Sequence, residues 1–445
     1  MRAQEPTTGR KPPDLPREGA TASRSRRSGR SLVYTSRTVP DPSPAPYRYA
    51  EQIPCYEPFE PEYVEELIER VFGPVMAHWF RPRLVGGERL PRCGPAVLAA
   101  NHSGNSFPYD GMVLDAMLWR REGYPRYGKI RGVFEKELTT TWWMRPFGID
   151  NFWRRGGGVD MTFDNFDRLL ERGERVLYFP EGVPGIGKGF FRRYRLQRFS
   201  SSFVTLAERH RAPVYPIHIV NAEWTIPFCF TIPWLDRLTQ RLLGVPFIPL
   251  PLAPIGVVFP FLWYLALPVR MVFVVGEPID VSTLVEDARA RTAGLEEREL
   301  MRRVAEDIRR RTQAELDLHV ERYGNRPYHA KSLAAHLGAR WRSLPRILPT
   351  GWTFTFVRHE RDRRRPPARS RLDALLRDWD LLFYYLPLGW PFLSLARRFR
   401  KPPYGYRGLT PKERREREGA FHWHLKERPL PPRGEEPTPS VIKAG

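Results

Sequence analysis

The sequence predicts an α/β fold in which helices flank a mostly parallel sheet, and three observations lead to that prediction. Short apolar runs alternate with helical segments between residues 95 and 275, which is the pattern of β/α units. The 445 residues are 41% hydrophobic, enough for one large domain with appendages or two modest domains. Both ends of the chain are instead rich in Pro and charged residues without apolar periodicity, so we expect disordered termini.

This pattern divides the chain into four expected segments. Residues 1–58 form a basic tail rich in Pro and Ser, and residues 59–325 form the α/β domain. Residues 326–401 form a helical C-terminal extension that contains an apolar helix, and residues 402–445 form a charged, Pro-rich tail.

The elements of the domain are expected in the following order. An amphipathic helix runs from Pro61 to about Trp79, with apolar side chains at helical spacing. Asp160 is expected to cap a helix that Gly173 ends. The remaining predicted strands cover 95–100, 130–134, 176–179, 214–220 and 270–275, and the predicted helices cover 111–121, 140–146, 161–172, 201–211 and 281–323.

The turn after the 95–100 strand carries the clearest chemical signal. It reads Asn-His-Ser-Gly-Asn-Ser-Phe-Pro-Tyr-Asp-Gly over residues 101–111, and it opens a helix. An imidazole at His102 can take a proton near neutral pH, and a carboxylate at Asp110 can fix its tautomer. The alternative is that Asp110 only caps the helix.

Further segments follow this turn in a fixed order: 148–155, the turn Phe-Pro-Glu-Gly at 179–182, 212–217 and 275–279. Together they resemble the glycerolipid acyltransferase superfamily over roughly residues 70–320. Two departures stand out. The family's Asp lies five positions after the His, where this chain has Phe107, so the first motif is a variant His-(x)7-Asp. Val183-Pro184 replaces the family's Thr-Arg, whose Arg contacts phosphate in many relatives.

The resemblance implies an O-acyltransferase without metal or prosthetic group. His102 would be the general base and Asp110 its orienting partner. Backbone N–H groups of residues 103–106 are plausible donors to an oxyanion. Predicted substrate-binding residues are Glu181, Gly182, Arg154, Arg155 and Lys188. The alternatives are an ordinary turn at Glu181-Gly182, surface charge at Arg154 and Arg155, and a solvated Lys188.

The implied partners are acyl-CoA or an acyl carrier protein as donor and a lipid hydroxyl as acceptor. The family resemblance implies lysophosphatidic acid as the acceptor. Because Val183-Pro184 replaces the family's Thr-Arg, a neutral acceptor such as diacylglycerol is an alternative. The competing function is a non-catalytic membrane-surface protein with a decayed site. A P-loop reading of residues 182–188 fails because Gly189 stands where magnesium binding needs Ser or Thr. No nucleic-acid-reading module is recognisable.

The charge and the apolar segments together predict that the protein acts at a membrane surface. The net charge of +22 suits an anionic partner. Residues 244–269 carry no charge but contain six prolines, which contradict a regular spanning helix. Either this segment lies against the bilayer or it is a buried loop, and the aromatic run 381–395 either meets the interface or docks on the domain. Three scattered cysteines and no apolar leader favour the cytoplasmic face of a membrane, with peripheral or monotopic attachment.

Overall fold

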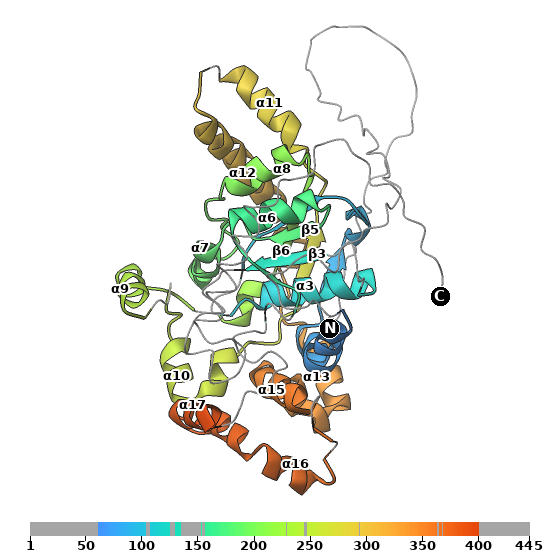
Figure 1. The fold of residues 1–445 in the computed structure, drawn as a ribbon, viewed down its shortest axis with the longest axis vertical. Coiled ribbons are helices and arrows are strands. Elements are labelled where there is room, and N and C mark those ends of the chain that lie inside the picture. The colour runs from blue at the N-terminus through green and yellow to red at the C-terminus, as the bar shows by residue number, and fades with distance from the viewer. Residues whose placement is uncertain are drawn as a thin grey trace, which may run out of the picture. The chain divides into compact units, whose positions relative to one another are not determined.

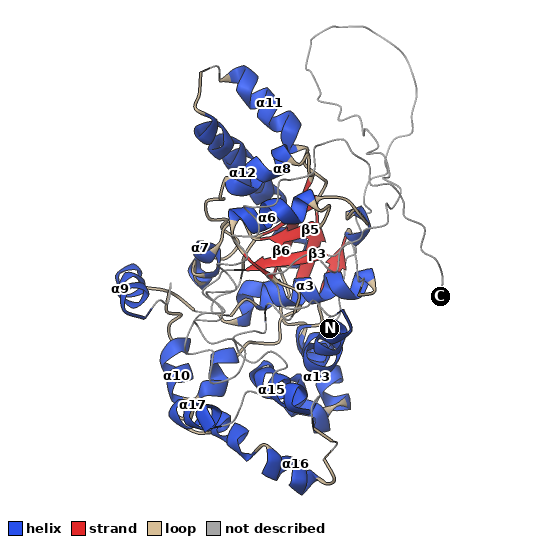
Figure 2. Cartoon of the chain, viewed as in Figure 1, coloured by secondary structure: helices blue, strands red, loops and turns tan. Residues whose placement is uncertain are grey.

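The computed structural model describes residues 61–399, apart from 104–106, 125–129, 135–152, 154–155, 228, 244–246, 293, 363–364 and 367. Within this part of the chain, seven strands form one sheet in the order β1-β7-β6-β2-β5-β3-β4. Figures 1 and 2 show the sheet between helices. Every pairing is parallel except β6 with β7. The predicted α/β fold with a mostly parallel sheet is therefore confirmed. The strands are β1 (Arg83–Val85), β2 (Ala96–Ala100), β3 (Ile130–Phe134), β4 (Val159–Asp160), β5 (Arg175–Tyr178), β6 (Val214–Val220) and β7 (Val272–Val275).

Apolar side chains of the sheet alternate between two cores. Along β2, Leu98 belongs to one core while its neighbours Val97 and Ala99 belong to the other. Because helices cover both faces, all five residues of β2 are buried, as expected for a central parallel strand. The first core packs against α3 (Tyr109–Glu122) and the N-terminal helices, and the second against α6 (Phe163–Glu171), α8 (Ser202–Arg209), α11 (Val281–Arg291) and α12 (Glu297–Tyr323).

Several predicted elements need correction. The cap of α6 is Thr162, whose side chain accepts from the N–H of Asn165 at 3.1 Å, whereas Asp160 ends β4. The predicted helix 281–323 is two helices, because the chain turns between α11 and α12, where Gly294 has a φ of +86°. The predicted helix 140–146 and both predicted disordered tails lie outside the described residues.

The N-terminal helical run is continuous from Pro61 to Phe80 and widens to a π-helix at η1 (Leu67–Phe72) and η2 (Met76–Phe80). It packs against α15 (Trp352–Asp362) of the C-terminal extension. The phenol of Tyr63 donates to Glu360 Oε1 at 2.7 Å, and the rings of Phe72 and Trp352 lie 5.1 Å apart. Residues 358–362, which begin a strongly basic run, thus belong to α15, and Glu360 and Arg361 are buried there.

The Pro-rich segment is irregular, as predicted, with one short helix, α10 (Leu252–Val258), and one 3₁₀ turn, η7 (Pro260–Tyr264). It is neither wholly buried nor wholly exposed, because Tyr264 is buried while Ile255 and Val257 are exposed. Across the described residues we find no helix both long and apolar enough to cross a membrane.

The helical C-terminal extension is also confirmed, and its apolar run does dock on the domain. The run forms a 3₁₀ segment, η10 (Trp379–Tyr385), and enters α17 (Trp390–Phe399). Leu381, Tyr384 and Leu393 are buried in the first core. Their neighbours Leu386, Leu388 and Phe392 stay exposed, so only one side of the run is docked.

Candidate active site

The site lies where the carboxyl ends of β2, β5 and β6 meet, which is where open parallel sheets place their ligands. His102 follows β2, and Asp110 lies in the first turn of α3. The structure brings the two together: His102 Nδ1 lies 3.1 Å from Asp110 Oδ2. With Nδ1 held by the carboxylate, Nε2 is the ring nitrogen left to take a proton.

Asp110 is a partner of the imidazole and not a helix cap. The cap position of α3 is Pro108, and no side chain caps this helix. Asp110 Oδ2 also accepts from the N–H of Ser103 at 2.7 Å, and Oδ1 accepts from the N–H of Gly111 at 2.8 Å. Burial alone would raise the pKa of Asp110, but His102 and these two N–H groups outweigh burial and lower it. The carboxylate is therefore ionised at neutral pH, as an orienting partner must be.

The loop that carries His102 is held by Glu181 and Lys188. Glu181 Oε1 accepts from the backbone N–H of His102 at 2.9 Å, and Oε2 accepts from that of Gln197 at 2.7 Å. The ammonium of Lys188 donates to the backbone carbonyl of His102 at 2.6 Å. Both backbone groups of His102 are thus bonded by buried charges, which fixes the imidazole against the sheet.

These contacts change the roles predicted for two residues. Lys188 has a fully buried side chain, so the ammonium is neither solvated nor placed to grip a phosphate. The structure gives it a positioning role instead. Glu181 is likewise buried with both oxygens bonded to backbone N–H groups, which also makes it a positioning residue, and its acceptor-binding role stays a prediction.

A third buried charge, Glu223, completes the support and was missed in the sequence. It lies just beyond β6, with Oε1 at 3.9 Å from Lys188 Nζ and 3.1 Å from the N–H of Tyr194. Burial raises the pKa of Glu223 to about 7, although Lys188 opposes the shift. The signal in the sequence was an acidic residue shortly after an apolar strand. This strand, β6, pairs with β2, so a residue beyond its end lies near the site.

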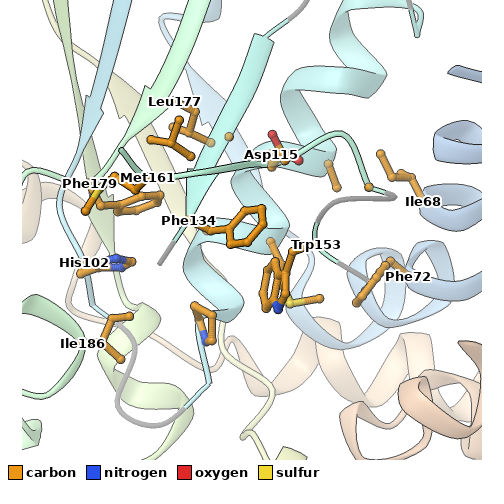
Figure 3. A pocket seen from close by; sticks show the side chains of 18 of the residues that line it. Ile68, Phe72, His102, Asp115, Phe134, Trp153, Met161, Leu177, Phe179 and Ile186 are labelled. Carbon is orange, nitrogen blue, oxygen red and sulfur yellow. The ribbon is translucent and has the colours of Figure 1, made fainter. Parts of the chain in front are cut away.

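An apolar cavity of about 130 Å³ opens beside His102. Figure 3 shows His102 and Phe179 at one side of it, Ile68 and Phe72 at the other, and Phe134 between them. The ring of Phe179 stacks on the imidazole at 4.0 Å between centroids. A long apolar group could lie in this cavity with its end against the imidazole.

Of the other predicted site residues, Gly182 lines the same cavity, and its φ of +56° is a conformation that favours glycine. Arg154 and Arg155 lie outside the described residues, as does most of the predicted oxyanion turn 103–106. Trp153, which lies in the 148–155 segment but was not predicted as a site residue, lines the cavity, and Phe107 packs beside it with ring centroids 6.0 Å apart. The family's Asp position is thus occupied by an aromatic side chain.

Comparison with known proteins agrees with this geometry. Residues 81–220 match the model of the family described as Acyltransferase. This match shows that residues 81–220 are similar to an acyltransferase domain.

Among curated proteins, uncharacterized proteins of Mycobacterium tuberculosis and Mycobacterium bovis are 32% identical over 233 residues. The match spans 50% of this chain and 58% of those proteins, so the chain spans less than two thirds of their length. Among solved structures, the 1-acyl-sn-glycerophosphate acyltransferase of Thermotoga maritima aligns with 15% identity and a TM-score of 0.31, covering 57% of this chain and 79% of that one.

Proposed function

We propose that this protein is a membrane-associated O-acyltransferase that moves a fatty acyl group from a thioester to the hydroxyl of a glycerolipid. The observation that carries the proposal is a buried His102–Asp110 pair, 3.1 Å apart, beside an apolar cavity. The cavity offers a place for the acyl chain, and the imidazole stands at its edge. The acyltransferase domain supplies the reaction class.

The reaction follows from the orientation of the imidazole. His102 Nε2 takes the proton of the acceptor hydroxyl while its oxygen attacks the thioester carbonyl. The tetrahedral oxyanion then collapses, the C–S bond breaks, and the thiolate takes the proton back from the imidazolium. The carboxylate of Asp110 stabilises the imidazolium between these two steps.

The donor is acyl-CoA or an acyl carrier protein, and the acceptor is lysophosphatidic acid or a neutral lipid such as diacylglycerol. A purified-protein assay that follows thiol release with this panel tests the proposal. Wild type should consume thioester only when an acceptor is present. His102→Ala should lower the rate by about 10²–10⁴-fold, the usual contribution of general-base assistance. More than half the wild-type rate in a folded His102→Ala protein would exclude this mechanism.

We also propose that the protein works at the cytoplasmic face of a membrane, bound peripherally or monotopically. The supporting observation is an exposed apolar surface shared by α10 and α17. The N–H of Leu388 donates to the carbonyl of Val258 at 2.6 Å, and Trp390 Nε1 donates to that of Gly256 at 3.1 Å, so the two segments lie side by side (Figure 1). This apolar surface comprises the exposed side chains of Ile255, Val257, Val258, Leu386, Leu388, Phe392 and Leu395.

A vesicle cosedimentation series tests the membrane proposal. Full insertion of one Leu or Phe side chain is worth about 1.5–3 kcal/mol, so Leu388→Ser with Phe392→Ser should weaken binding at least tenfold. Leu318→Ser is the matched control. This side chain is 63% exposed, but it lies on α12, which packs on the second core and is not part of the apolar surface. Attraction to anionic vesicles should fall with salt while the apolar part persists.

Wild-type protein that stays in the supernatant with anionic vesicles at low salt would exclude the membrane proposal. A second candidate function, non-catalytic membrane-surface binding, would be favoured if vesicles bind while no acceptor supports thiol release.

A further inference from the structure

A second cavity, of about 500 Å³, adjoins the apolar cavity at Gly182. Its walls come from the start of α6, the segment 198–202 before α8, and the N-terminal turns of α12. Met161 and Gly182 line both cavities. The two spaces therefore adjoin at the turn that follows β5, close to His102.

The second cavity is cationic, in contrast to the first. Arg198, Arg298 and Arg302 line it, and we call it the arginine cavity. Arg302 is paired with Glu299 at 3.4 Å, but Arg198 and Arg298 form no ion pair with any part of the chain that the structure describes. The acid in its wall, Glu181, is buried with both oxygens bonded to backbone N–H groups. Within the described residues, the charges of Arg198 and Arg298 are thus left uncompensated.

Three serine hydroxyls line the same cavity as these arginines. Ser200, Ser201 and Ser202 line the arginine cavity where α8 begins, and the N-terminal end of a helix favours negative charge. Guanidinium groups bind phosphate oxygens with two parallel hydrogen bonds, and a hydroxyl can add a further one. Carboxylates are also bound in this way, but several donors converging on one space suit an anion with three or more oxygens.

We propose that the arginine cavity binds a phosphate ester carried by one of the two substrates while the acyl chain occupies the apolar cavity. This inference rests on the proposed acyl transfer and names the part of the substrate that the second cavity holds. The phosphate belongs either to the donor, as in coenzyme A or a phosphopantetheine carrier, or to the acceptor, as in a lysophosphatidic acid. An amphipathic substrate that spans both cavities must pass the Gly182 turn, which carries its reacting group past the imidazole.

Kinetics with matched substrates separates the two sources. The double variant Arg198→Ala/Arg298→Ala should raise the KM of the phosphorylated substrate roughly tenfold or more, since each charged hydrogen bond contributes about that factor. If the donor carries the phosphate, the KM of acyl-CoA rises while that of a phosphate-free acyl-N-acetylcysteamine thioester does not. If the acceptor carries it, the KM of lysophosphatidic acid rises while that of diacylglycerol does not. Arg303→Ala is the control, because Arg303 lies on α12 but does not line the cavity.

A binding experiment keeps the inference separate from the proposed function. Calorimetric titration with coenzyme A and with glycerol 3-phosphate measures phosphate binding without turnover. Wild type should bind one of them, and the double variant should lose at least tenfold in affinity. Equal binding by both proteins, or no binding of either ligand by wild type, overturns the inference. A wild type that binds the ligand but turns over no thioester would sink the proposed function and leave the phosphate site standing.

Discussion

Replacing Lys188 by Met tests whether buried charges hold the His102 loop. The Nζ atom of Lys188 lies 3.8 Å from Glu181 and 3.9 Å from Glu223, and all three side chains are fully buried. At an effective dielectric of about 20, each of these distances corresponds to about 4 kcal/mol of attraction. Methionine removes this cation from beside two buried carboxylates, and breaking a buried pair in this way costs about 3–5 kcal/mol.

The loss should depend on pH. In the variant, the pKa of Glu223 rises further above its unfolded value, because the cation that opposed burial is gone. When the pKa of a carboxyl group is higher in the folded than in the unfolded protein, the free energy of unfolding falls as pH rises through the folded-state pKa. The free energy of unfolding should therefore fall by about 3–5 kcal/mol at pH 8 and by less at pH 5.

Urea denaturation followed by circular dichroism at both pH values measures this loss, and thiol release measures its effect on the site. The carbonyl of His102 also loses its donor, so turnover should fall even where the protein is folded. The double variant Lys188→Met/Glu223→Gln should recover part of the stability at pH 8, since one stranded charge is removed. A single variant as stable as wild type at pH 8 would refute the charge-support reasoning.

Three further changes test other parts of the molecule. Burial raises the pKa of Asp115 to about 7, and at about 1.4 kcal/mol per pKa unit this lowers the free energy of unfolding by up to roughly 4 kcal/mol above pH 7. Asp115→Asn should therefore raise the free energy of unfolding more at pH 8 than at pH 5. Equal gains at the two pH values would contradict this prediction. Asp110→Asn should slow thiol release less than His102→Ala does, and the reverse order would remove Asp110 from its orienting role. Arg361→Met removes the guanidinium that contacts Asp378 and Asp380 at 2.8 and 2.6 Å, so limited proteolysis should cut the C-terminal extension sooner. An unchanged digestion pattern would show that this ion cluster does not hold the extension.

The sequence was most informative where structure depends on neighbouring residues. The strands at 130–134 and 214–220 were predicted with their observed bounds, because short segments that contain Val and Ile between turn residues leave few alternatives. His102 and Asp110 were paired for a similar reason, since they share one turn and eight positions separate them. The cap of α6 failed because two adjacent polar residues, Asp160 and Thr162, both suit a cap, and pairing of Asp160 in the sheet decided between them.

What the sequence could not give was the environment of Lys188. A lysine among glycines is expected to be exposed, and its burial depends on Glu181, which follows the same strand, and on Glu223, which follows β6. Such a charge is tolerated only because those acids meet it in the folded protein. The arginine cavity escaped prediction for the same reason, because Arg198 and Arg298 lie a hundred positions apart and α12 brings them to one space.

The bond between Tyr63 and Glu360 joins residues 297 positions apart, and it has a consequence for synthesis. The N-terminal helical run forms the wall of the apolar cavity at Ile68 and Phe72, yet α15, the helix that covers this run, is synthesised much later. At about 5–20 residues per second, the nascent chain exposes that apolar helix face for about 15–60 s before its partner leaves the ribosome. A chain that terminates before Trp352 would therefore leave the ribosome with a sheet but with one wall of the cavity uncovered, a form that chaperones and proteases recognise by its exposed apolar surface.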